Sequence, residues 1–192
     1  MAAKVKDAGL QLVGCGVITM NDEAAARTAF EYARDAGIPL IICSLDPANV
    51  GMLDKLVKEF NQRVAIHNHG PEDKRFPTPD SVWEGIAKLD ERIGLCIDIG
   101  HTIRTGTDPA QSIRKHAKRL YDMHLKDVTS VQPNGKNIEC GRGVIDLVAV
   151  MKALRDIKYQ NHVALEYEIN ADDPVPGMAE SIGYVKGILA TM

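Results

Sequence analysis

Four short apolar segments of this chain each run into side chains that are able to bind a metal ion. The segments cover residues 64–70, 94–101, 121–127 and 163–168. Short apolar runs are typical of buried parallel strands, and the ligands of α/β proteins gather beyond the carboxyl ends of such strands. Imidazoles and carboxylates together suit divalent cations, so we expect one metal site built from the polar groups of these segments: His67, His69, Asp98, His101, His124, Glu166 and Glu168.

Each of these residues also has a plainer interpretation. Asp98 follows an apolar run, where an ionised carboxylate is costly to bury without a cation or several hydrogen-bond donors, and such donors alone would also satisfy it. His124 could be a core histidine bound to a carbonyl oxygen. His67 and His69 share one face of their strand, as do Glu166 and Glu168. We therefore expect one member of each pair to bind metal and the other to contact substrate or support the site.

Further polar groups near these segments could assist catalysis or bind substrate. Lys126 lies on the same side of its strand as His124, where its ammonium could polarise a carbonyl or hold a phosphate, unless it is a solvated loop lysine. Arg142, between Gly141 and Gly143, is either an anion clamp or part of a tight turn. The candidate catalytic residues are Glu166, Glu168, His69 and Lys126, and the candidate substrate-binding residues are His101, Arg142 and Asn68.

Composition narrows the class of protein. The 192 residues favour one domain over residues 1–192, because the chain is too short for two ordinary domains. The net charge is −3 and the basic residues are scattered, which argues against a nucleic-acid partner. No stretch approaches the roughly 18 apolar residues of a membrane span, and residues 1–7 have no signal-peptide core. We expect a cytoplasmic protein without membrane contact, and its four scattered cysteines to be free.

The hydrophobic pattern alternates strands and helices along the whole chain. Strand and helix repeat about six times, which predicts right-handed crossovers and a parallel sheet, as in a β/α barrel. A complete barrel has eight such units in about 250 residues, so about two units are lacking. The expected strands begin at residues 10, 40, 64, 94, 120 and 163, the first running to residue 18. The expected helices cover residues 21–37, 52–60, 80–89 and 145–157, one begins at 108–109, and the last ends near 189.

The order of these motifs resembles a known family. Residues 66–73 (IHNHGPED), 96–101 (CIDIGH), 123–127 (MHLKD), 141–146 (GRGVID) and 164–168 (ALEYE) resemble the sugar phosphate isomerase/epimerase family of the xylose isomerase-like TIM barrel superfamily. The resemblance extends over nearly the whole chain from residue 10. It implies that the first strand here corresponds to the third of the family, so the first two β/α units are missing and the barrel is truncated at its N-terminal side.

The resemblance also implies a cofactor and an activity. It places a single divalent metal ion, with manganese favoured over zinc, magnesium, cobalt or iron, on Asp98, His124 and Glu166. The fourth ligand, commonly a glutamate, falls on His67, which departs from the family pattern. The implied activity is that of a metal-dependent isomerase, epimerase or lyase, dehydratases included, that acts on a sugar, sugar phosphate or keto-sugar through an enediolate. Related apurinic endonucleases need further ligands near residue 137 that this chain lacks, so we expect no cleavage of abasic DNA.

An incomplete barrel leaves a second possibility open. The chain could be a non-catalytic barrel fragment or subunit that binds metal or sugar and needs a partner to complete the barrel. Six strands in an open sheet leave two apolar edges with unpaired backbone groups. We therefore expect these edges to be covered in a homo-oligomer, by another partner, or by upstream residues of a longer natural chain.

Overall fold

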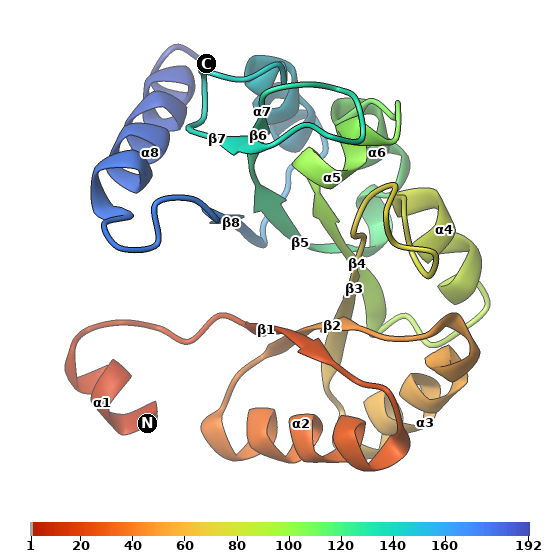
Figure 1. Cartoon of the computed structure of the whole chain (residues 1–192). Coiled ribbons are helices and arrows are strands. Elements are labelled where there is room, and N and C mark those ends of the chain that lie inside the picture. The colour runs from red at the N-terminus through yellow and green to blue at the C-terminus, as the bar shows by residue number, and fades with distance from the viewer. Residues whose placement is uncertain (1) are drawn as a thin grey trace.

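The computed structural model describes residues 2–192 and is built around one curved parallel sheet (Figure 1). All neighbouring strands of this sheet are parallel. This arrangement confirms the predicted α/β fold with about six strands. In spatial order the strands are β1 (Cys15–Thr19), β2 (Leu40–Ser44), β3 (Arg63–His67), β4 (Ile93–Asp98), β5 (Leu120–Leu125) and β8 (His162–Leu165).

Helices cover the outer side of the curved sheet (Figure 1). Most helices connect one strand of the sheet to the next, as in β/α units. Two short 3₁₀ helices, Pro47–Asn49 and Ala117–Arg119, complete the helical segments. The α-helices are α1 (Ala2–Asp7), α2 (Glu23–Ala36), α3 (Val50–Phe60), α4 (Pro79–Ile86), α5 (Ile99–Arg104), α6 (Pro109–Lys115), α7 (Leu147–Asp156) and α8 (Val175–Ala190).

The helix boundaries agree with the signals in the sequence. Asp22 caps α2 by accepting a hydrogen bond from the Ala25 N–H, and Gly37 ends the helix in the left-handed conformation. Asp108 caps α6 in the same way, with Pro109 as its first residue. These caps set the residues at which α2 and α6 begin.

The main core lies between the sheet and the helices. It includes Phe30 of α2, Leu53 of α3 and Ile97 of β4, all fully buried. The inner face of the sheet carries a smaller apolar cluster of Leu40, Ile42, Ala65 and Cys96. Both faces of the central strands are therefore buried, as expected for a barrel-type sheet. The four cysteines are free, as predicted.

Several short elements differ from the prediction. The first strand covers Cys15–Thr19 and not residues 10–18, and Leu10 is exposed. Helices α1 and α5 were not predicted, because six residues give too little apolar periodicity to detect. Residues 130–143, where no strand was expected, contain β7 (Asn137–Ile138), which pairs antiparallel with β6 (Asp127–Val128). No described helix is long and apolar enough to cross a membrane.

The sheet is open between its two end strands. Within residues 2–192, β1 pairs only with β2, and β8 pairs only with β5. Apolar side chains are exposed near the β8 edge, including Val163 on the strand and Ile182 and Leu189 on α8. These features match the predicted open edges. What covers them stays a prediction.

Candidate metal centre

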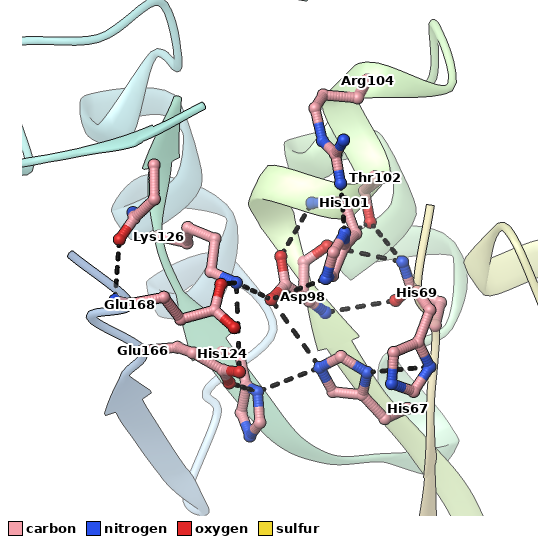
Figure 2. A network of polar contacts seen from close by, with 12 residues as sticks. His67, His69, Asp98, His101, Thr102, Arg104, His124, Lys126, Glu166 and Glu168 are labelled. Atoms are coloured by element: carbon pink, nitrogen blue, oxygen red, sulfur yellow. Dashed lines mark hydrogen bonds and ion pairs between the residues drawn. The ribbon is translucent and has the colours of Figure 1, made fainter. Parts of the chain in front are cut away.

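The four candidate ligands come together at one edge of the sheet (Figure 2). They come from four neighbouring strands: His67 is the last residue of β3, Asp98 ends β4, His124 lies in β5, and Glu166 directly follows β8. Asp98 and His124 are paired in register across β4 and β5. We call these four residues the candidate metal centre.

The ligand atoms of the candidate metal centre lie within 4.8 Å of one another. His67 Nε2 is 3.0 Å from His124 Nδ1 and 3.7 Å from Asp98 Oδ2. Glu166 Oε2 contacts His124 Nδ1 from the other side. Ligands about 2.1 Å from one cation are at most about 4.2 Å apart. Only small side-chain shifts are therefore needed for these four atoms to share an ion.

The carboxylate of Asp98 is the group that most strongly indicates a bound cation. It is fully buried, and its Oδ1 accepts a hydrogen bond from the His101 N–H, which caps α5. Its Oδ2 has no hydrogen-bond partner among the described residues. Lys126 Nζ lies 3.2 Å from this oxygen, at an ion-pair distance but without hydrogen-bond geometry. A buried carboxylate oxygen left in this way is suited to a cation.

Asp98 is ionised although it is fully buried. Burial tends to raise its pKa, but the neighbouring His67 and the ammonium of Lys126 outweigh burial and hold the pKa well below its usual value. Burial lowers the pKa of His67 to about 4, so its imidazole is neutral at pH 7. A neutral imidazole and an ionised carboxylate are the protonation states that metal binding requires.

A carboxylate that was not predicted from the sequence lies beside His124. Asp122 Oδ2 lies 3.5 Å from His124 Nε2, on the far side of the ring from the other candidate ligands. A carboxylate in this position orients a ligating imidazole and raises its basicity. The signal was present in the sequence, because Asp122 is two residues before His124 and shares its strand face. A second possible ligand group, His67, Cys96 and His124, is less suitable because burial raises the pKa of the Cys96 thiol well above its usual value.

Lys126 is buried, contrary to its interpretation as a solvated lysine. Its Nζ lies 2.5 Å from Glu168 Oε2 and 3.9 Å from Glu166 Oε1, in addition to its ion pair with Asp98. The side chain passes over Gly100, where a Cβ would lie 2.8 Å from Lys126 carbons. The ammonium therefore borders the candidate metal centre and connects it to Glu168.

His69 and His101 lie beside the ligands. His69 Nδ1 is 3.4 Å from His67 Nδ1 and 3.5 Å from Asp73 Oδ2, and its ring is partly exposed. His101 Nε2 is 3.9 Å from Asp98 Oδ2. Burial lowers the pKa of both imidazoles. Asp73 and Arg104, the neighbours of these rings, were not identified from the sequence because they come from loops and a short helix.

The structure corrects the substrate-binding expectation for Asn68 and leaves that for Arg142 open. Asn68 is fully buried, and its amide is used within the protein: Nδ2 donates to Thr102 Oγ1 at 3.2 Å, and Oδ1 accepts from the Asp98 N–H at 3.1 Å. It positions the end of β4 and has no free surface for a ligand. Arg142 forms a two-bond ion pair with Glu180 of α8, at 2.6 and 2.8 Å, and its side chain is exposed, so its role toward an anion stays a prediction.

The turn around Arg142 is held by Asp127. This buried carboxylate accepts hydrogen bonds from four backbone N–H groups, those of Val128 and Ile145 on Oδ1 and those of Gly141 and Gly143 on Oδ2. The glycines thus serve a tight turn, which was the alternative interpretation of this motif. A Cβ at Gly143 would lie 2.2 Å from Asp127 Oδ1, so only glycine fits there.

Comparison with known proteins assigns the fold to a family. The sequence profile described as "Xylose isomerase-like TIM barrel" matches residues 3–188. The chain belongs to the xylose isomerase-like TIM barrel family. This membership confirms the predicted fold class and the resemblance inferred from the motifs.

The chain is similar to parts of several curated relatives. An inosose dehydratase of Clostridium tetani is 36% identical over 81 residues, covering 40% of this chain and 25% of the relative. The rhizopine catabolism protein MocC of Rhizobium meliloti is 34% identical over 76 residues, covering 40% and 23%. An inosose dehydratase of Clostridium botulinum is 24% identical over 152 residues, covering 70% and 49%. The chain therefore matches at most about half the length of these relatives.

Solved structures share the fold at low sequence identity. The 3-keto-D-glucoside 4-epimerase YcjR of E. coli superposes with a TM-score of 0.81 at 16% identity, covering 97% of this chain and 82% of that one. The IolI protein, with a bound zinc atom, also gives 0.81 at 14% identity, covering 99% and 81%.

The histidines predict a pH dependence of stability. Burial lowers the pKa of four of the six histidines: His67, His69, His101 and His116. Below pH 6.5 these histidines become protonated in the unfolded state but stay neutral in the folded state. The free energy of unfolding therefore falls as the pH falls. We expect the free energy of unfolding of chelator-treated protein to decrease from pH 7.5 to pH 5, with His67 alone contributing about 2 kcal/mol. Urea denaturation at several pH values measures this.

The variant His116→Gln tests the pH dependence of stability without changing the candidate metal centre. His116 contacts Asp80 and lies outside the centre. We expect the variant to show a smaller loss of stability on acidification than the wild type. Unfolding free energies that stay constant from pH 7.5 to pH 5 would contradict the buried, neutral state assigned to these histidines.

Proposed function

We propose that this chain carries the metal-binding side of a divalent-metal-dependent enzyme that isomerises, epimerises or dehydrates a sugar or a sugar-derived polyol. The observation that carries the proposal is the convergence of His67, Asp98, His124 and Glu166 around a buried carboxylate oxygen that has no hydrogen-bond partner within residues 2–192. Family membership and the names of the relatives, inosose dehydratases and a keto-glucoside epimerase, support this class of substrate.

The proposed cofactor is one divalent cation held by the candidate metal centre. Two imidazole nitrogens and two carboxylate oxygens form a mixed set that suits manganese, zinc or iron, and manganese is our preferred ion. When bound, the cation would polarise a substrate carbonyl and acidify the neighbouring C–H group.

The remaining residues would move the proton and stabilise charge. Glu168 has an exposed carboxylate that is oriented by Lys126, so it is placed to accept a proton from a substrate carbon. His69, neutral and partly exposed on the opposite side, is a second candidate base, and Glu166 is a third. Lys126 has donors and no acceptor, so its role would be to stabilise negative charge that develops on a substrate oxygen.

A substitution of Lys126 tests this division of roles. Lys126→Met should lower turnover by about 10²–10⁴-fold while leaving metal binding in place, because the ammonium contacts the ligands without being one. The assay is a panel of keto sugars, sugar phosphates, inososes and 3-keto-glycosides with added manganese. Lys152→Met, a change of the same kind on the exposed side of α7, serves as the control. Full activity in Lys126→Met would contradict the proposed role.

A second candidate function follows from the open sheet. The unpaired edges of β1 and β8 favour a subunit or fragment that becomes active only when further strands close the barrel. The two candidates differ in a measurable way. An enzyme that is complete in these residues turns over a substrate of the panel alone, whereas a subunit binds metal with no turnover until its partner is added.

A further inference from the structure

Arg104 makes an unusual contact with the imidazole of His101 (Figure 2). Both residues lie on α5, three residues apart, and Arg104 Nη2 is 2.6 Å from His101 Nδ1. Arg104 Nη1 lies 2.5 Å from Glu72 Oε1 and 2.7 Å from the Pro133 carbonyl oxygen. The arginine side chain is only 11% exposed. Its guanidinium is thus fixed by two loops and a helix at the border of the candidate metal centre.

This contact determines which nitrogen of His101 carries the proton. A guanidinium has only donors and remains protonated in proteins, so His101 Nδ1 must accept the hydrogen bond and be unprotonated. The neutral ring then carries its proton on Nε2. His101 Nε2 is 3.9 Å from Asp98 Oδ2, beyond hydrogen-bond distance. The Nε2–H group therefore faces the candidate metal centre without an acceptor among the described residues.

The backbone is built to allow this arrangement. Gly70, which follows the β3 strand end, has a φ of +84°. A Cβ at this position would lie 3.0 Å from His101 Nδ1, 3.2 Å from Arg104 Nη2 and 3.3 Å from Glu72 Oε2. Glycine at position 70 thus gives the three side chains room to meet.

We propose that Arg104, held by Glu72, is a positioning residue that keeps His101 in the Nε2–H tautomer, so that His101 donates a hydrogen bond to a neutral hydroxyl or carbonyl oxygen of the substrate. The substrate part of this inference rests on the proposed function, whereas the tautomer does not. An imidazole whose Nδ1–H is bound by a carboxylate or carbonyl presents a lone pair at Nε2, which suits a metal ligand or a base. Arg104 instead leaves the lone pair on Nδ1 and the proton on Nε2 of His101. His101 therefore acts neither as a further metal ligand nor as the base.

Nitrogen NMR of ¹⁵N-histidine-labelled, chelator-treated protein at pH 7.5 reads the tautomer directly. The His101 signals are assigned by their loss in His101→Gln. We expect a protonated Nε2 and an unprotonated Nδ1 in the wild type, and loss of this single-tautomer pattern in Arg104→Met. Arg104→Lys, which keeps a cationic donor, should restore at least part of the pattern. Arg114→Met, on the exposed side of α6, should leave it unchanged.

Two results would overturn the inference: a protonated Nδ1 on His101 in the wild type, or the wild-type pattern in a folded Arg104→Met. If Arg104→Met does not fold, Glu72→Gln weakens the same contact from an exposed site and should shift the tautomer equilibrium in the same direction. An unchanged equilibrium in that variant would also count against the proposal. Because the spectra need neither metal nor substrate, failure of the proposed function would leave the tautomer result standing and would remove only the role toward substrate.

Discussion

Asp98→Asn is expected to lower the affinity of the protein for a divalent cation by more than about 100-fold. The change replaces a buried, charged ligand oxygen by a neutral amide at the centre of the ligand group. Asparagine also caps helices, so the hydrogen bond from the His101 N–H to position 98 can persist and α5 should keep its place. Isothermal titration of chelator-treated protein with manganese and with zinc measures the effect.

The chain offers a matched control for this substitution. Asp108 is the N-cap of α6 and accepts hydrogen bonds from the Ala110 and Gln111 N–H groups, but it lies outside the candidate metal centre. Asp108→Asn should bind metal as the wild type does. Wild-type affinity in Asp98→Asn would mean that the buried carboxylate serves only as a helix cap.

The second large effect is expected on stability. Asp127→Ala removes the acceptor of four backbone N–H groups, two of which belong to the glycine turn at residues 141–143. Each buried donor left without a partner costs about 1–3 kcal/mol, partly offset by entering water. We expect the free energy of unfolding to fall by about 4 kcal/mol, as measured by urea denaturation.

Asp146→Ala is the comparison for this second prediction. Asp146 caps α7 through one hydrogen bond from the Ala149 N–H, so its loss should cost about 1 kcal/mol. If Asp127→Ala were no more destabilising than Asp146→Ala, the four hydrogen bonds would not be holding the turn.

The strand ends were predictable because two independent signals coincide there. At Asp98 and His124 an apolar run marks a buried strand, and a polar side chain interrupts it close to the carboxyl end. Parallel strands then bring these ends to one edge of the sheet without any knowledge of tertiary contacts. The same reasoning placed His67 and His69 at this edge and left the choice of ligand between them open. The caps at Asp22 and Asp108 gave helix starts to within a few residues.

The contacts between loops were not predictable in this way. Arg142 lies between two glycines, as an anion-binding arginine would, but its guanidinium pairs with Glu180, which is 38 residues away in sequence. Arg104 reaches Glu72 across a separation of 32 residues. Such pairs depend on where loops and short helices settle on the sheet, and no local periodicity encodes that.

Anomalous diffraction from crystals of the protein loaded with zinc tests the candidate metal centre directly. We expect one strong peak about 2.0–2.2 Å from His67 Nε2, Asp98 Oδ2, His124 Nδ1 and a carboxylate oxygen of Glu166. A zinc peak at another place in the molecule, with none between these four side chains, would contradict this expectation.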